Sequence, residues 1–331
     1  MKKALSRYAV TVGVLWLASL PAGWFYFASQ DVPVYVALPF TIALMVEAAL
    51  YILPGFEGVR CAVAHAGNPR ALAAALAAGG VLPYLIYSAP TGVFAWSSLA
   101  ALAALAAAVA FWYVALPRRA AVDVLFLVLM VVVSLSPVFK LAIPSLSPKA
   151  PGELLGRLMW IRLGIAAMLF LRGVEGVGFG FVPNRRDWKI GLAHWAAFLP
   201  IAFVLNLVLG FARPRPWPPA DPWRTVLAAV AIFCGMLWVT ALSEEFFFRG
   251  LLQQWLAAWT GSRNAALLAA SAMFGAAHLW FPPGFPNWRF TILAAAAGLF
   301  YGRAFQTART IRAAMVTHAL VNLTWRLFFF H

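Results

Sequence analysis

The chain has 331 residues, of which 64% are hydrophobic and only 11% are charged, with a mean hydropathy of +0.85. Soluble domains carry about 25% charged residues, so the composition excludes an ordinary soluble enzyme and predicts an all-α polytopic membrane protein. The formal net charge of +15 does not indicate a nucleic-acid partner, because the basic residues are scattered through short connections.

Apolar stretches of membrane-spanning length, about 20 residues, recur about eleven times. They lie near 8–28, 32–53, 70–88, 92–115, 120–142, 154–172, 190–211, 223–243, 264–281, 289–308 and 311–330. The first stretch follows two lysines, but further stretches follow at once, so we interpret it as a transmembrane helix rather than a secretory signal. Alternate connections are richer in arginine if the N-terminus is cytoplasmic, which predicts that orientation and is compatible with a prokaryotic inner membrane.

A segment rich in proline and serine at 144–151 interrupts the helical pattern. It predicts a boundary between an N-terminal membrane module of about five helices, residues 1–150, and a second module, residues 151–331. The first module shows no chemistry in its sequence. Its Glu47 lies within an apolar stretch, and we interpret this carboxylate as one that reaches the membrane interface from near a helix end.

The second module contains charged residues in apolar sequence, where charge is costly and usually functional. Glu245 and Arg249 are four residues apart, so on a helix they share a face and form an ion pair. Glu244 points about 100° away around the helix, towards other partners. Two adjacent carboxylates with different partners can take different roles, one fixed and one free for proton transfer.

Two histidines follow in the later apolar stretches. His278 ends an apolar run that reads as a buried helix, where a single histidine is more often a packing residue than a catalyst. His318 and Asn322 have a spacing of four and therefore share one face of the last helix. An asparagine can donate to an oxyanion, and a histidine can donate, accept or bind a metal.

Together these residues resemble the CAAX-protease and bacteriocin-processing family of intramembrane proteases, also called the Abi family. The resemblance rests on Glu-Glu-x3-Arg at 244–249, Phe248-Arg249-Gly250, Phe-x3-His ending at His278, and His-x3-Asn at 318–322, and it covers about 154–331. It implies hydrolysis of a peptide bond in a membrane-associated peptide or protein. Glu244 and His278 would activate water, His318 and Asn322 would bind the oxyanion, and Glu245 and Arg249 would form a structural pair.

This interpretation depends on whether a metal is required and on where Glu244 lies along its helix. Glu244, His278 and His318 are sufficient as zinc ligands with an open position, but the resemblance implies a glutamate-dependent enzyme, so we expect no required metal or other cofactor. If a span ended at residue 243, Glu244 would lie at one membrane face and about 20 Å from His278. We therefore expect the Glu244 helix to continue through Phe246–Trp259, with Glu244 at its middle and His278 opposite it.

Two other functions use the same residues. A transporter or proton channel would use the glutamate and histidine side chains as a relay, but it predicts broken helices or similar halves, and the sequence shows neither. A non-catalytic membrane scaffold would use the polar residues only to hold helices or bind a partner. The identity of the substrate is not encoded in any pattern we recognise.

Overall fold

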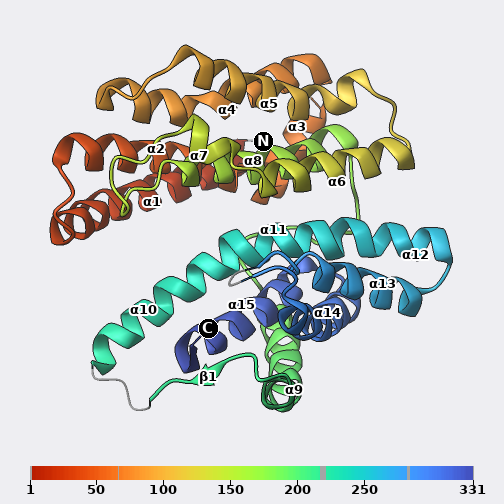
Figure 1. Ribbon diagram of the computed structural model, residues 1–331. Coiled ribbons are helices and arrows are strands. Elements are labelled where there is room, and N and C mark those ends of the chain that lie inside the picture. The colour runs from red at the N-terminus through yellow and green to blue at the C-terminus, as the bar shows by residue number, and fades with distance from the viewer. Residues whose placement is uncertain (1, 66, 217–220, 282–283, 331) are drawn as a thin grey trace. The chain divides into compact units, whose positions relative to one another are not determined.

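The computed structural model describes residues 2–65, 67–216, 221–281 and 284–330, with the side chains of residues 2–4 and 64–65 excepted. The chain forms two compact units, Met1–Val174 and Glu175–His331, and almost every element is a helix (Figure 1). In the described residues, seven helices are long and apolar enough to cross a membrane. The predicted helical, polytopic membrane architecture is confirmed.

All eleven predicted stretches are helical, but they do not all qualify as spans. The stretch at 120–142 is divided into helices of 16 and 5 residues, and the one at 264–281 is a helix of only 14 residues. Arginines at 289, 303, 312 and 326 lower the hydropathy of the last two helices. The difference between eleven and seven therefore arises in helices that are too short or too charged to qualify as spans.

The first unit is a helical bundle in which α4 packs against α2 and α5, and α8 packs against all three. Its elements are α1 (Lys2–Ser29), α2 (Val34–Ile52), η1 (Leu53–Gly55), α3 (Glu57–His65), α4 (Pro69–Thr91), α5 (Trp96–Ala115), α6 (Ala120–Leu135), α7 (Val138–Ala142), α8 (Glu153–Ala166) and η2 (Ala167–Arg172).

A buried ion pair connects three of these helices. Arg162 on α8 donates to both carboxylate oxygens of Glu47 on α2, at 2.7 and 3.0 Å, and to the backbone carbonyl of Gly79 on α4 at 3.0 Å. Glu47 is fully buried, so the prediction that it reaches the interface is wrong. A buried carboxylate needs a partner, and Arg162 supplies one.

Because of the contacts of α8, the boundary between the two units lies later in the chain than we predicted. We predicted a boundary after residue 150, whereas the first compact unit ends at Val174 and the second begins at Glu175. Helix α8 follows the proline-rich break, yet its Arg162 pairs with Glu47, and its apolar residues pack on α2, α4 and α5. Side-chain packing therefore keeps α8 with the N-terminal helices.

In the second unit, α14 lies at the centre and packs against α9, α13 and α15. The elements are α9 (Arg185–Leu209), β1 (Arg213–Pro214), α10 (Pro222–Gly235), η3 (Met236–Ala241), α11 (Leu242–Glu245), η4 (Phe246–Gln253), α12 (Gln254–Thr260), α13 (Arg263–Ala276), α14 (Trp288–Ala308), α15 (Ile311–Phe328) and β2 (Phe329–Phe330). The two-residue strands pair antiparallel. They join the loop that follows α9 to the end of α15.

Candidate functional site

One continuous helix of 39 residues, Pro222–Thr260, carries both adjacent glutamates (Figure 1). Asp221 caps its start by accepting from the Arg224 backbone N–H at 3.0 Å, and Gly261, with φ of 67°, ends it. Glu244 therefore lies near its middle, as we expected from the sequence. At no more than about 58 Å, this helix is longer than a membrane core of about 30 Å.

The helix is not regular around the glutamates. The α-helical turn α11, which holds Glu244 and Glu245, lies between the π-helical segments η3 and η4. π-Helical turns are rare and are often found at functional sites. A π-helical turn changes the direction in which its side chains point, and Arg249 lies within η4.

Glu245 is fully buried and has two partners. Its Oε2 lies 3.2 Å from Nε of Arg249, and its Oε1 lies 2.7 Å from Nδ1 of His318 on α15. Arg249 is also fully buried and donates to the backbone carbonyl of Gly298 at 3.0 Å. The expected pair of Glu245 and Arg249 is therefore present, and the carboxylate in addition holds a histidine that the sequence did not connect with it.

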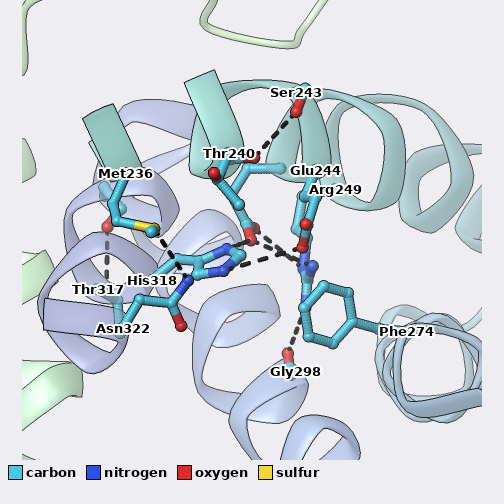
Figure 2. Close-up of polar contacts among 12 residues, drawn as sticks. Met236, Thr240, Ser243, Glu244, Arg249, Phe274, Gly298, Thr317, His318 and Asn322 are labelled. Atoms are coloured by element: carbon cyan, nitrogen blue, oxygen red, sulfur yellow. Dashed lines mark hydrogen bonds and ion pairs between the residues drawn. The ribbon is translucent and has the colours of Figure 1, made fainter. Parts of the chain in front are cut away.

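The imidazole of His318 lies close to Glu244 and Arg249 (Figure 2), and its contact with Glu245 orients the ring. Because a carboxylate accepts, we assign the proton to Nδ1, which leaves Nε2 directed at the other glutamate, 3.9 Å from Oε2 of Glu244. Tyr301 on α14 stacks on the ring, with centroids 4.5 Å apart and planes 12° apart. A hydrogen bond and a stacked ring thus hold His318 in one orientation.

Glu244 differs from its neighbour in exposure and in partners. Its side chain is 31% exposed, whereas that of Glu245 is 0% exposed. Among the described residues, its buried Oε2 has no hydrogen-bond partner. A buried oxygen without a partner is costly, so this carboxylate is available for a water molecule or a substrate, as a proton-transfer group must be.

His278 contributes a second oriented imidazole from the end of α13. Its Nδ1 lies 2.7 Å from the backbone carbonyl of Phe274. A carbonyl oxygen only accepts, so the proton is assigned to Nδ1, and Nε2 of the neutral ring keeps its lone pair. His194 makes the same contact with the carbonyl of Ile190 at 2.8 Å, which shows that this hydrogen bond alone does not define a site.

The four residues predicted to be catalytic line one cavity of about 300 Å³, and they are Glu244, His278, His318 and Asn322. Asn322 lies one turn after His318, and its Nδ2 is 3.7 Å from the sulfur of Met236. Most of the remaining wall is aromatic or aliphatic and comes from α9, α13, α14 and α15. Ligand sites commonly have this form, an apolar hollow with a few polar groups.

The metal ligands considered in the sequence, Glu244, His278 and His318, line the same cavity. Among the described residues, no group of three histidine, cysteine, aspartate or glutamate side chains is arranged to hold a metal ion. The cavity combines carboxylate, imidazole and amide groups, which can accept or transfer a proton or donate a hydrogen bond.

Sequence reasoning missed the support that α14 gives to this site. Gly298 and Gly302 accept hydrogen bonds through their carbonyls from Arg249 and Gln253, at 3.0 and 3.3 Å. The sequence Gly298-Leu-Phe-Tyr-Gly302 has the glycine spacing that permits close approach of membrane helices, and this signal was available. Tyr301 lies within it, but no pattern indicated its contact with His318.

Residues 225–324 match one family model, described as "Type II CAAX prenyl endopeptidase Rce1-like". The matched segment contains the cavity-lining Glu244, His278, His318 and Asn322, together with the pair of Glu245 and Arg249. No curated protein and no solved structure matches the chain.

Proposed function

We propose that this integral membrane protein hydrolyses a peptide bond of a membrane-associated peptide or protein. The proposal is supported by the match of residues 225–324 to the model of the Rce1-like type II CAAX prenyl endopeptidases. The single observation that carries the proposal is the common cavity of Glu244, His278, His318 and Asn322. Neither a nucleic acid nor a required cofactor is part of the proposal. The proposed location is a prokaryotic inner membrane, with the N-terminus in the cytoplasm.

The proposed reaction begins with a water molecule between Glu244 and His278. Glu244 takes one proton as the water oxygen attacks the carbonyl carbon, and the partnerless Oε2 and the free Nε2 of His278 are the acceptors that orient this water. The carbonyl π-bond electrons move to the oxygen and form an oxyanion. The proton held by Glu244 then passes to the leaving nitrogen as the C–N bond breaks and the carboxyl group forms.

His318 and Asn322 stabilise the oxyanion in this proposal. When His318 is protonated, its Nε2–H points into the cavity while Nδ1–H remains bonded to Glu245. The carboxylate of Glu245 lies 2.7 Å from Nδ1 of His318 and 3.2 Å from Nε of Arg249, so it holds the imidazole in this orientation. The amide of Asn322 is the second donor. Removal of one such donor typically lowers kcat about 10²- to 10³-fold.

The test uses the full chain reconstituted in lipid vesicles. Its first probe is a farnesylated peptide ending in Cys-aliphatic-aliphatic-X, with a fluorophore and a quencher on opposite sides of the bond after the cysteine. The second probe is the membrane proteome of an expression host, in which new termini are compared between the native chain and the Glu244→Gln variant. We expect Glu244→Gln and His278→Ala to lower cleavage at least about 10²-fold.

The chain supplies matched controls for both substitutions. Glu175→Gln removes an exposed carboxylate from the same unit, and His194→Ala removes a histidine with the same backbone contact as His278. Both controls should keep native cleavage, and cleavage should also survive a metal chelator. Native rates in Glu244→Gln would exclude the proposed reaction. Loss of activity with the chelator, restored by zinc, would instead make Glu244, His278 and His318 metal ligands.

A further inference from the structure

A second cavity in the C-terminal unit, of about 310 Å³, lies apart from the four residues of the candidate site. It is lined by glutamines and arginines from η4, α12, α13, α14 and the turn after α14, by the apolar Ala257 and Phe305, and by Gly176 of the loop before α9. Its side chains include Gln253, Gln254, Arg263, Gln306 and Arg309. No carboxylate lines it. The cavity therefore has a cationic and amide-rich character that the proposed peptide hydrolysis does not use.

The two arginines of this cavity lack acidic partners. Neither Arg263 nor Arg309 takes part in an ion pair within the described part of the chain, although Arg162, Arg172, Arg249 and Arg312 all do. Arg263 is the first residue of α13, directly after the turn that ends the 39-residue helix, and Arg309 follows the end of α14. Both are exposed, so their guanidinium groups are accessible to a ligand.

A buried glutamine supplies an independent indication of a ligand. Gln253 is 3% exposed and lines the cavity, and its Nε2 is used in the bond to the Gly302 carbonyl. Its Oε1 has no hydrogen-bond partner in the described residues. A buried acceptor without a donor is costly. A ligand of the cavity supplies negative charge for the arginines, and a hydroxyl or amine donor on it satisfies Gln253 when the amide turns away from Gly302, against which Oε1 is buried.

We propose that this cavity binds a phosphate-bearing group that also carries a hydroxyl or amine donor. The phosphate accepts from Arg263 and Arg309, and the donor reaches Oε1 of Gln253 when this side chain turns from Gly302 towards the cavity. Phosphatidylglycerol and phosphatidylethanolamine headgroups have this chemistry, as have soluble glycerol phosphates. The position at the end of a membrane-spanning helix suits a headgroup, since basic pockets between transmembrane helices commonly hold anionic lipids.

Two substitutions test the arginines with little risk to the fold. Arg263→Gln keeps an extended polar side chain on an exposed first turn. Arg309 has a φ of 58°, a conformation that favours glycine, so Arg309→Gly removes the charge and also relieves the backbone. The matched control is Arg185→Gln, which removes an exposed arginine of the same unit, also at the first residue of a helix, that does not line the cavity.

The measurement is lipid retention by the full chain, read by native mass spectrometry after exchange between phosphatidylglycerol and phosphatidylcholine nanodiscs. A parallel arm measures thermal unfolding in a neutral detergent with inorganic phosphate or glycerol 3-phosphate. We expect Arg263→Gln and Arg309→Gly each to weaken the apparent affinity for the preferred ligand about fivefold, whereas Arg185→Gln leaves it unchanged.

The two arms distinguish the source of the phosphate. Retention of phosphatidylglycerol that depends on both arginines identifies a lipid headgroup. Stabilisation by glycerol 3-phosphate that depends on the same arginines, without lipid retention, identifies a soluble ligand, and either result supports the site. The proposal would be overturned if the two variants, Arg185→Gln and the native chain all showed equal retention of phosphatidylglycerol and equal stabilisation by glycerol 3-phosphate.

Discussion

At the scale of single residues, two adjacent glutamates have opposite environments. Glu245 is buried, and its carboxylate is held between Arg249 and His318, whereas Glu244 is partly exposed and its Oε2 lies no closer than 3.9 Å to Nε2 of His318. As a consequence, Glu245 orients His318, and Glu244 faces the cavity. The environment of each side chain, rather than its chemical type, separates the two.

Tyr301 is expected to control how well His318 is held. Tyr301→Phe keeps the ring that stacks on the imidazole, so we expect cleavage within about twofold of the native rate. Tyr301→Ala removes a ring contact of about 0.5–1.5 kcal/mol and leaves space in which His318 can turn, so we expect a loss of tenfold or more in kcat.

Steady-state kinetics on the farnesylated peptide measures this difference. The phenylalanine variant is the matched control for expression and folding. Equal kcat for Tyr301→Ala and the native chain would show that the stacked ring has no part in orienting the histidine.

At the scale of elements, α14 positions the site through its backbone. Gly298 and Gly302 stand one turn apart and present carbonyls to Arg249 and Gln253 on the long helix. A Cβ at Gly298 would lie 3.2 Å from Nη2 of Arg249 and equally close to the backbone of Ser271. A Cβ at Gly302 would contact Leu267 too closely and lie 2.6 Å from Oε1 of Gln253. An added methyl group at either glycine therefore requires its neighbours to shift.

We predict that Gly302→Ala lowers the thermal stability of the chain in detergent, with a cost of about 1–3 kcal/mol from overpacking. Gly298→Ala should in addition lower cleavage, because it displaces Arg249 from its position beside Glu245. Gly284→Ala is the control, since nothing lies within 4 Å of a Cβ there. A Gly302→Ala variant that unfolds at the native temperature would contradict the packing argument.

At the scale of the whole molecule, each unit contains its own buried ion pair. Arg162 and Glu47 connect three helices of the first unit, and Arg249 and Glu245 stabilise the second. Removal of one partner leaves an uncompensated charge, at a cost of about 3–5 kcal/mol, whereas replacement of both by apolar residues is often neutral. The first pair connects helices directly, whereas the second lies within one helix and connects it to α14 through Arg249 and to α15 through Glu245.

For the first unit we predict that Glu47→Ala strongly lowers the unfolding temperature, and that the double variant Glu47→Leu, Arg162→Met recovers most of the loss. Thermal unfolding of the purified full chain measures both. An undiminished unfolding temperature for Glu47→Ala would mean that Arg162 finds another partner or water.

Much of this architecture could be predicted, because membrane helices and charges in apolar sequence leave strong patterns. The stretches at 8–28 and 32–53 and the continuation of the Glu244 helix are examples, as is the spacing that pairs Glu245 with Arg249. The connection between Glu47 and Arg162, 115 residues apart, could not be predicted. Such partners are chosen by tertiary packing, on which local periodicity carries no information. The assignment of catalytic roles stays a prediction.

The length of the helix Pro222–Thr260 has one more consequence. Since the helix continues from Pro222 to Thr260, we expect a tilt at either end to change the position of the glutamates near its centre. Bilayer thickness acts on such tilts. We therefore expect the position of Glu244 to depend on the thickness of the surrounding bilayer.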